Sequence, residues 1–170
     1  MVEQPATLTE NPLDVGLAAE RRAGPATIVI FGASGDLTHR KLVPALYNLA
    51  AQRLLPEHFA VVAFARRPYE NVTYREELRA AAEAFSRTPL QPGIWETLAA
   101  GIQYLRGDFQ DPDAYARLAE LLTQLDAAPG VTGNRIFYLA TPPEHYPVIV
   151  ERLREAGLNQ TPSDGDVRLI

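Results

Sequence analysis

The sequence predicts an α/β fold, in which a doubly wound, mainly parallel sheet is covered by helices on both faces. Two observations support this prediction. Short apolar runs rich in β-branched and aromatic residues alternate with longer segments whose apolar residues recur at helical spacing. The short runs are apolar at consecutive positions, which is typical of strands buried on both faces. Since parallel strands are joined by right-handed crossovers, few topologies fit this order.

Five short apolar runs are expected to form the strands. They are residues 27–31, 60–65, 102–105, 135–140 and 167–170.

Helices are expected between these runs. Residues 40–53 have helical spacing but contain Pro44, which is tolerated only in a first helical turn. The regular helix should therefore start just before Pro44, or the residues before it should form a looser turn. Thr73 and Glu76 form a capping-box signature that opens a helix to about Arg87. Further helices are expected over 89–100, from 111–112 to 125, and over 145–156, the last stopping at Gly157.

The 170 residues suit one domain, which we expect over residues 25–170. Residues 1–24 mix charges with proline and glycine and are expected to be a disordered tail. A net charge of −5 without a basic run argues against nucleic acid as a partner.

The absence of cysteine excludes disulfides, thiolate metal sites and a cysteine nucleophile, and no metal site is expected. No apolar run reaches the ~18 residues that span a bilayer, and no basic segment precedes an apolar stretch at the N-terminus. The sequence therefore predicts a cytoplasmic protein without a membrane partner.

The first predicted strand runs into a glycine turn. Gly32 permits a backbone angle that a β-carbon would forbid, and Gly35 allows close approach of a ligand. The following helix directs free N–H groups and its positive dipole end to the same spot, which suits a pyrophosphate. We therefore expect a Rossmann-like dinucleotide-binding domain. The turn departs from G-x-G-x-x-G, with Ser34 and Thr38 in place of the later glycines, so a tight turn without a ligand is the alternative.

Two charged residues follow this turn. The carboxylate of Asp36 would repel a phosphate, so Asp36 is expected to cap the helix or to accept bonds from N–H groups of the turn. Lys41, near the start of the helix, either faces a phosphate or is solvated.

The second predicted strand ends in Arg66 and Arg67, and no acidic residue follows until Glu70. An NAD site usually has an acidic residue here, whereas an arginine pairs with the 2′-phosphate of NADP. The sequence therefore predicts NADP as the cofactor, unless the two arginines are only a solvated edge.

Residues 31–49 closely resemble the signature of the glucose-6-phosphate dehydrogenases. They read Phe31-Gly32-Ala33-Ser34-Gly35-Asp36-Leu37-Thr38-His39-Arg40-Lys41-Leu42-Val43-Pro44-Ala45-Leu46-Tyr47-Asn48-Leu49. Residues 63–66, 134–143 and 167–170 are similar to that family in the same order.

This resemblance implies a domain of an enzyme that uses NADP to oxidise glucose 6-phosphate at C1 to 6-phosphogluconolactone. That reaction opens the oxidative pentose phosphate pathway, and the full-length enzyme is expected to be a homo-oligomer. By position, Lys41 would lie near the cofactor and the sugar phosphate, and Arg66 would pair with the 2′-phosphate. Tyr138, more often a core position on general grounds, would line the cofactor cleft, and the bend at 142–143 would lie beside the nicotinamide. The phosphate turn would comprise Gly32, Ala33, Ser34, Gly35, Asp36 and Leu37.

The family's Glu-Lys-Pro-Phe-Gly and Arg-Ile-Asp-His-Tyr-Leu-Gly-Lys-Glu stretches, the second with the catalytic histidine, do not occur in these 170 residues. By position, His39, His58 and His145 cannot take that role, so no catalytic residue is expected. The end inside a strand suggests truncation, and the domain is expected to be inactive alone. A free-standing NADP-binding regulatory module is the alternative. An unrelated short-chain-type reductase would need Tyr-x-x-x-Lys, and Lys41 is the only lysine.

Overall fold

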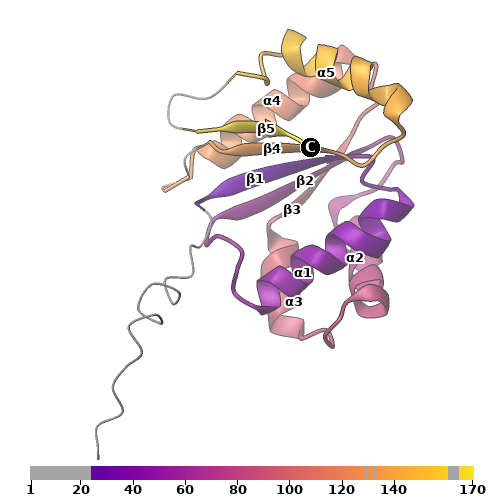
Figure 1. Cartoon of the computed structure of the whole chain (residues 1–170), viewed down its shortest axis with the longest axis vertical. Helices are drawn as coiled ribbons and strands as arrows, with labels where there is room; N and C mark the ends of the chain where they lie inside the picture. Colours follow the sequence, from indigo (N-terminus) through magenta and orange to yellow (C-terminus); the bar gives the residue numbers. More distant parts are fainter. Residues whose placement is uncertain (1–23, 129, 132, 161–164) are drawn as a thin grey trace, which may run out of the picture.

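A computed structural model describes residues 24–128, 130–131, 133–160 and 165–170, so the predicted tail lies almost entirely outside the described residues. The sheet has five strands in the order β3-β2-β1-β4-β5, and all neighbours are parallel (Figure 1). This confirms the predicted fold class and the five predicted strands. Their bounds are β1 Ala26–Phe31, β2 Phe59–Ala65, β3 Ile102–Arg106, β4 Arg135–Leu139 and β5 Val167–Leu169.

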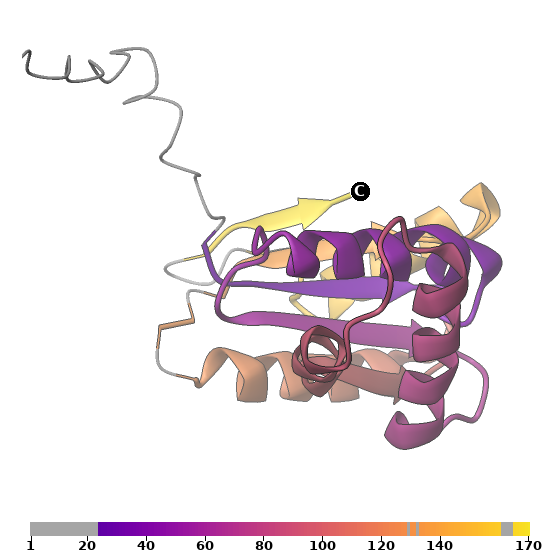
Figure 2. The same cartoon turned by 90° about the horizontal axis from the view of Figure 1, so that it is seen from below.

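Helices cover both faces of the sheet (Figure 1). One face carries α1 (Val43–Ala51), α2 (Asn71–Phe85) and α3 (Pro92–Ala100), which lie in front of the strands in Figure 2. The other face carries α4 (Pro112–Asp126) and α5 (Tyr146–Glu155). No described helix is both long enough and apolar enough to cross a membrane.

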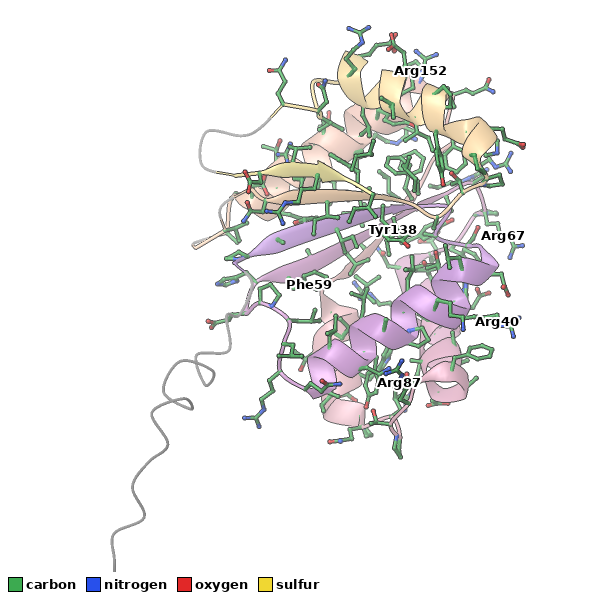
Figure 3. All side chains as sticks on the ribbon, viewed as in Figure 1. Arg40, Phe59, Arg67, Arg87, Tyr138 and Arg152 are labelled. Carbon is green, nitrogen blue, oxygen red and sulfur yellow. The ribbon has the colours of Figure 1, made fainter. Side chains whose placement is uncertain are left out.

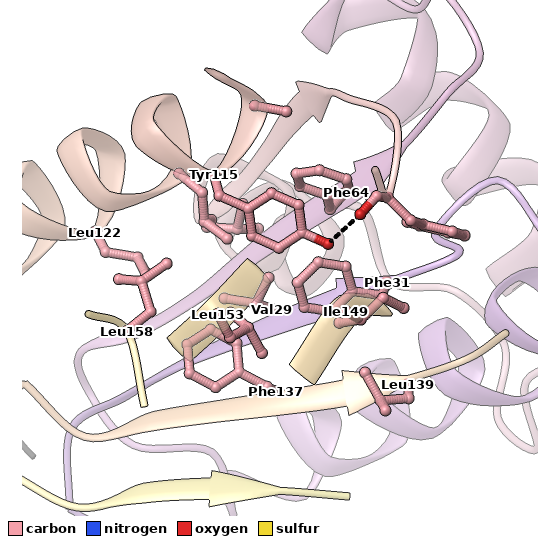
Figure 4. Close-up of a cluster of buried hydrophobic side chains, with 14 residues drawn as sticks. Val29, Phe31, Phe64, Tyr115, Leu122, Phe137, Leu139, Ile149, Leu153 and Leu158 are labelled. Atoms are coloured by element: carbon pink, nitrogen blue, oxygen red, sulfur yellow. Dashed lines mark hydrogen bonds between the residues drawn. The ribbon is translucent and has the colours of Figure 1, made fainter. Parts of the chain in front are cut away.

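The two faces of the sheet belong to two hydrophobic clusters, because successive strand residues point to opposite sides. Phe31, Phe64 and Phe137 face α4 and α5, where they pack with Tyr115 and Ile149 (Figure 4). The cluster under α1, α2 and α3 contains Ile30, Ala63, Tyr47, Tyr74 and Trp95.

The chain becomes regular α-helix at Val43, directly before Pro44, as predicted. Residues Thr38–Leu42 form a π-helical turn, in which the Val43 N–H donates to the Thr38 oxygen. Pro44 has no N–H for the carbonyl of Arg40, and its ring would clash with that carbonyl in a regular helix. The wider turn relieves this conflict, so both parts of the prediction are confirmed.

Two predicted helix starts were wrong. Helix α2 begins at Asn71, so Thr73 lies inside its first turn and caps nothing. The Asn71 side chain instead accepts the Tyr104 N–H at 2.6 Å, which fixes the start of α2 against β3. Helix α3 begins at Pro92, three residues later than expected.

The last helix is preceded by a 3₁₀ turn at Pro143–His145. Gly157 follows it with φ +68°, as expected for a C-terminal glycine.

Candidate functional site

The strand order reverses between β1 and β4. In open α/β sheets, ligands bind at the carboxyl ends of the strands beside such a reversal. A cleft of about 320 Å³ lies there. Its lining residues come from the loops after four strands: Gly32, Ser34 and Gly35 after β1; Ala65, Arg66 and Arg67 at the end of β2; Phe109 after β3; and Ala140, Thr141, Pro142 and His145 after β4.

Gly32 allows the turn to pass directly against the end of β4. Its φ is +84°, and a β-carbon there would collide with the Ala140 oxygen and lie 2.9 Å from Cγ2 of Thr141. Its N–H donates to the Phe64 oxygen at 3.0 Å. A larger residue would therefore push β1 and β4 apart at the mouth of the cleft.

The turn leaves backbone donors free. Gly35 closes it by donating to the Gly32 oxygen at 2.9 Å, and the Ala33 N–H donates to the Phe64 oxygen at 3.2 Å. Within the described part of the chain, the N–H groups of Ser34, Asp36 and Leu37 have no protein acceptor. Unpaired N–H groups at a helix start, together with the positive end of the helix dipole, form a site for an anionic group.

Asp36 does not cap the helix, so that prediction was wrong. Asp36 already has helical conformation, which turns its side chain out to solvent. The carboxylate lies 3.7 Å from Nη1 of Arg40, one turn further on. This pairing offsets the negative charge beside the free N–H groups.

Lys41 is exposed on the π-helical turn and pairs with no described residue. It does not line the cleft. It shares a helix face with Leu37, four residues earlier, which is also exposed.

Arg66 and Arg67 follow directly from β2, and both are exposed. Arg67 points outward at this end of the sheet (Figure 3). The hydroxyl of Tyr69 raises the pKa of the Arg67 guanidinium through a hydrogen bond. Arg66 pairs with no described carboxylate and also borders two neighbouring clefts of about 460 and 420 Å³. It is therefore available to an anionic ligand.

Tyr138 is not among the residues that line the cleft. It pairs in register with Ile30 and is partly buried against the cluster under α1. The cleft residues after β4 are instead Ala140, Thr141 and Pro142. Pro142 belongs to the bend that the sequence singled out.

Five residues that line this cleft were not predicted as site residues: Ala65, Phe109, Ala140, Thr141 and His145. The hydroxyl of Thr141 is buried without a hydrogen-bond partner in the described residues. The rings of Phe109 and His145 lie 5.2 Å apart, and both residues line the cleft. Only a partial signal existed for Phe109: it follows β3, and the carboxyl ends of parallel strands lie at one edge of the sheet, but the strand order decides that it reaches this cleft.

His39 contacts both the glycine turn and α2. Its Nδ1 lies 2.8 Å from the Gly35 oxygen, and its Nε2 lies 3.6 Å from a carboxylate oxygen of Glu77. It therefore links the turn to α2.

The chain is similar to one enzyme family by sequence and by structure. The family model described as "Glucose-6-phosphate dehydrogenase, NAD binding domain" matches residues 29–170. Glucose-6-phosphate 1-dehydrogenase 2 of Mycobacterium tuberculosis is 43% identical over 150 residues, which are 88% of this chain and 29% of that enzyme.

Two solved structures share the fold. Glucose-6-phosphate 1-dehydrogenase from Mycobacterium avium has a TM-score of 0.69 and 28% identity, covering 86% of this chain and 29% of that one. A glucose-6-phosphate dehydrogenase in complex with its substrate glucose-6-phosphate has a TM-score of 0.73 and 26% identity, covering 86% and 30%. The chain thus spans less than a third of the relatives it matches.

Proposed function

Because the chain belongs to the glucose-6-phosphate dehydrogenase family, whose NAD-binding domain it matches, we propose that it binds NADP in the cleft after β1, β2 and β4. The observation that carries this proposal is that the free N–H groups of the glycine turn lie at the same cleft as Arg66, which follows the neighbouring strand and pairs with no carboxylate among the described residues. NADP has an anionic group for both of these features: its diphosphate for the N–H groups of the turn, and its 2′-phosphate for Arg66.

The diphosphate would lie on the glycine turn. Ser34, Asp36 and Leu37 would donate their free N–H groups to it, and Gly32 and Gly35 leave room for its approach. The Thr141 hydroxyl, which lies beside Gly32 and has no partner in the described part of the chain, would be a further donor for the bound cofactor. Ala33 would shape the turn from the core, where it is fully buried.

The 2′-phosphate would pair with Arg66. A guanidinium presents paired N–H donors that match phosphate oxygens, and its charge does not titrate near neutral pH. No acidic residue follows β2 until Glu70, so the usual carboxylate ligand of the NAD ribose is missing from this strand end.

We propose that the whole enzyme oxidises glucose 6-phosphate at C1 to 6-phosphogluconolactone, in the oxidative pentose phosphate pathway. The bound nicotinamide supplies the hydride acceptor. The reaction also needs a base for the C1 hydroxyl proton and a site for the sugar phosphate. We propose that these 170 residues do not supply the base and the sugar-phosphate site in full. They would therefore bind the cofactor without catalysing the reaction. We propose that the whole enzyme is a cytoplasmic homo-oligomer, as the resemblance to its family implies.

Calorimetric titration of the chain with NADP and with NAD tests the proposal. We expect tighter binding of NADP. Arg66→Ala should weaken NADP binding about ten- to hundredfold, because a charge-assisted hydrogen bond to phosphate is lost. NAD has no 2′-phosphate, so its affinity should change less than about twofold.

Arg87→Ala is the matched control. Arg87 is exposed beyond the carboxyl end of α2, pairs with no described residue and lines none of the clefts at the site (Figure 3). Arg87→Ala removes the same charge as Arg66→Ala, but at a position away from the cleft. Both affinities should therefore stay unchanged. Equal affinity for the two cofactors, or no heat with either, would reject the proposal.

A further inference from the structure

Three tyrosines form a cluster behind the site, between the glycine turn and the end of β2. Tyr69 precedes α2, Tyr74 lies in its first turns, and Tyr104 lies on β3. Their ring centroids are 5.7 Å apart for Tyr69 and Tyr74, 5.5 Å for Tyr69 and Tyr104, and 4.6 Å for Tyr74 and Tyr104. Such close aromatic packing fixes where the hydroxyl groups point.

Tyr74 holds the glycine turn. Its ring is buried, and its hydroxyl donates to the Ala33 oxygen at 2.8 Å. Ala33 is the residue between Gly32 and Ser34, so this bond fixes the backbone that presents the free N–H groups.

Tyr104 fixes the backbone of residues 65–67, the arginine segment. Its hydroxyl lies 2.6 Å from the Arg67 oxygen and 3.3 Å from the Ala65 oxygen, the carbonyls of the residues on either side of Arg66. The Arg67 oxygen also accepts the Tyr69 N–H at 3.1 Å. The backbone around Arg66 is therefore fixed by one hydroxyl and one tight turn.

We propose that Tyr74 and Tyr104 are positioning residues for different parts of the cofactor site. Tyr74 positions the glycine turn, which binds the diphosphate common to NAD and NADP, and Tyr104 positions the arginine segment, which selects NADP. This inference rests on the proposed function. Neither tyrosine lines the cleft, so each acts only through the backbone that it holds. Burial raises the pKa of Tyr104 to about 12 and raises that of Tyr74 as well, so both hydroxyls remain donors at neutral pH.

The test compares Tyr104→Phe, Tyr74→Phe and the unchanged chain by calorimetric titration with NADP and NAD. Tyr104→Phe should weaken NADP binding about three- to tenfold and leave NAD binding unchanged, so the ratio of the two affinities falls. Tyr74→Phe should weaken both by a similar factor and leave the ratio unchanged.

Tyr47→Phe is the matched control. Tyr47 is fully buried, and its hydroxyl bonds to the Pro89 oxygen at 3.0 Å and the Gln91 N–H at 2.7 Å, away from the cleft. Tyr47→Phe also removes one tyrosine hydroxyl, but this hydroxyl contacts neither the glycine turn nor residues 65–67, so neither affinity should change.

The ratio of affinities is insensitive to partial unfolding. Both cofactors are titrated into one preparation, so unfolded protein lowers the number of sites for both alike. An unchanged ratio in Tyr104→Phe, or an equal change of ratio in Tyr74→Phe, would overturn the inference while NADP preference in the unchanged chain still supports the proposed function. Absence of that preference in the unchanged chain would overturn both.

Discussion

At the scale of single residues, Gly32 is a position that does not accommodate a side chain, because its φ is positive and the Ala140 backbone lies where a β-carbon would be. Gly32→Ala should lower the free energy of unfolding by at least about 2 kcal/mol, since positive φ and a collision with backbone add up. NADP binding should be lost with it, because the turn must shift to relieve the contact with Ala140. Urea unfolding and calorimetric titration measure the two effects.

Gly93→Ala is the control for this change. Gly93 lies in α3, its φ is not positive, and a β-carbon there meets no atom within 4 Å. Alanine should therefore leave the protein equally stable or stabilise it slightly. Similar losses at the two glycines would contradict the role given to Gly32.

The sequence identified the positions of the site better than the directions of its side chains. Gly32 could be predicted because a glycine after a buried strand has a specific backbone reason to be there. The outward turn of Asp36 could not, because it depends on where the helix starts, one residue earlier than a cap requires. The face on which Tyr138 lies depends on strand register, and one step in register exchanges the two faces.

At the scale of elements, a largely buried ion pair joins the end of α4 to the start of β4. Nη2 of Arg135 lies 2.6 Å from Oδ2 of Asp126, and the two side chains are 11% and 19% exposed. Asp126→Ala should lower the free energy of unfolding by about 2–4 kcal/mol, because the Arg135 charge then remains largely buried and unpaired. Urea unfolding measures this.

Glu83→Ala is the matched control on α2. Arg79 and Glu83 are a similar pair at 3.2 Å, but both side chains are about half exposed. Solvent screening limits such pairs, so the loss should stay below about 0.5 kcal/mol. Equal losses for the two variants would show that burial does not set the strength of the Arg135 pair.

The sequence predicted which elements exist but not where α2 and α3 begin. Thr73 and Glu76 have the spacing of a capping box, yet the contact between Asn71 and Tyr104 on β3 starts α2 earlier. That contact joins residues 33 positions apart, and local patterns do not contain it. The π-helical turn was partly foreseeable, because the missing N–H of Pro44 is a local property.

At the scale of the whole molecule, the alternation of strand and helix was enough to predict a parallel sheet covered on both faces. It was not enough to predict which strand ends meet at the cleft, since that follows from the order β3-β2-β1-β4-β5. This order brings Phe109, after β3, to the same cleft as Thr141, after β4. Phe109 has no local motif that marks it, and Thr141 is marked only by the resemblance of residues 134–143 to the family.

Buried tyrosines on both faces of the sheet should make the folded protein sensitive to alkali. Burial raises the pKa of Tyr104 to about 12 and raises those of Tyr74 and Tyr115 too, against about 10 for an unfolded chain. The folded state therefore keeps protons that the unfolded state releases. The stability that these groups contribute is fully present below pH ~10 and is lost as pH rises through the folded values.

The free energy of unfolding, measured with urea at a series of pH values, should accordingly fall above pH ~10. A buried tyrosine such as Tyr74 steepens this fall by up to about 1.4 kcal/mol per pH unit, whereas solvent screening reduces the share of the partly exposed Tyr104. Tyr74→Phe removes one such group, so its stability should fall less steeply with pH than that of the unchanged chain. Tyrosinate absorbance should also appear at lower pH in urea than in the folded protein. Equal slopes for Tyr74→Phe and the unchanged chain would mean that the Tyr74 hydroxyl is not buried in the folded protein, and would weaken the assignment of Tyr74 as the support of the glycine turn, since its bond to the Ala33 oxygen lies in that buried position.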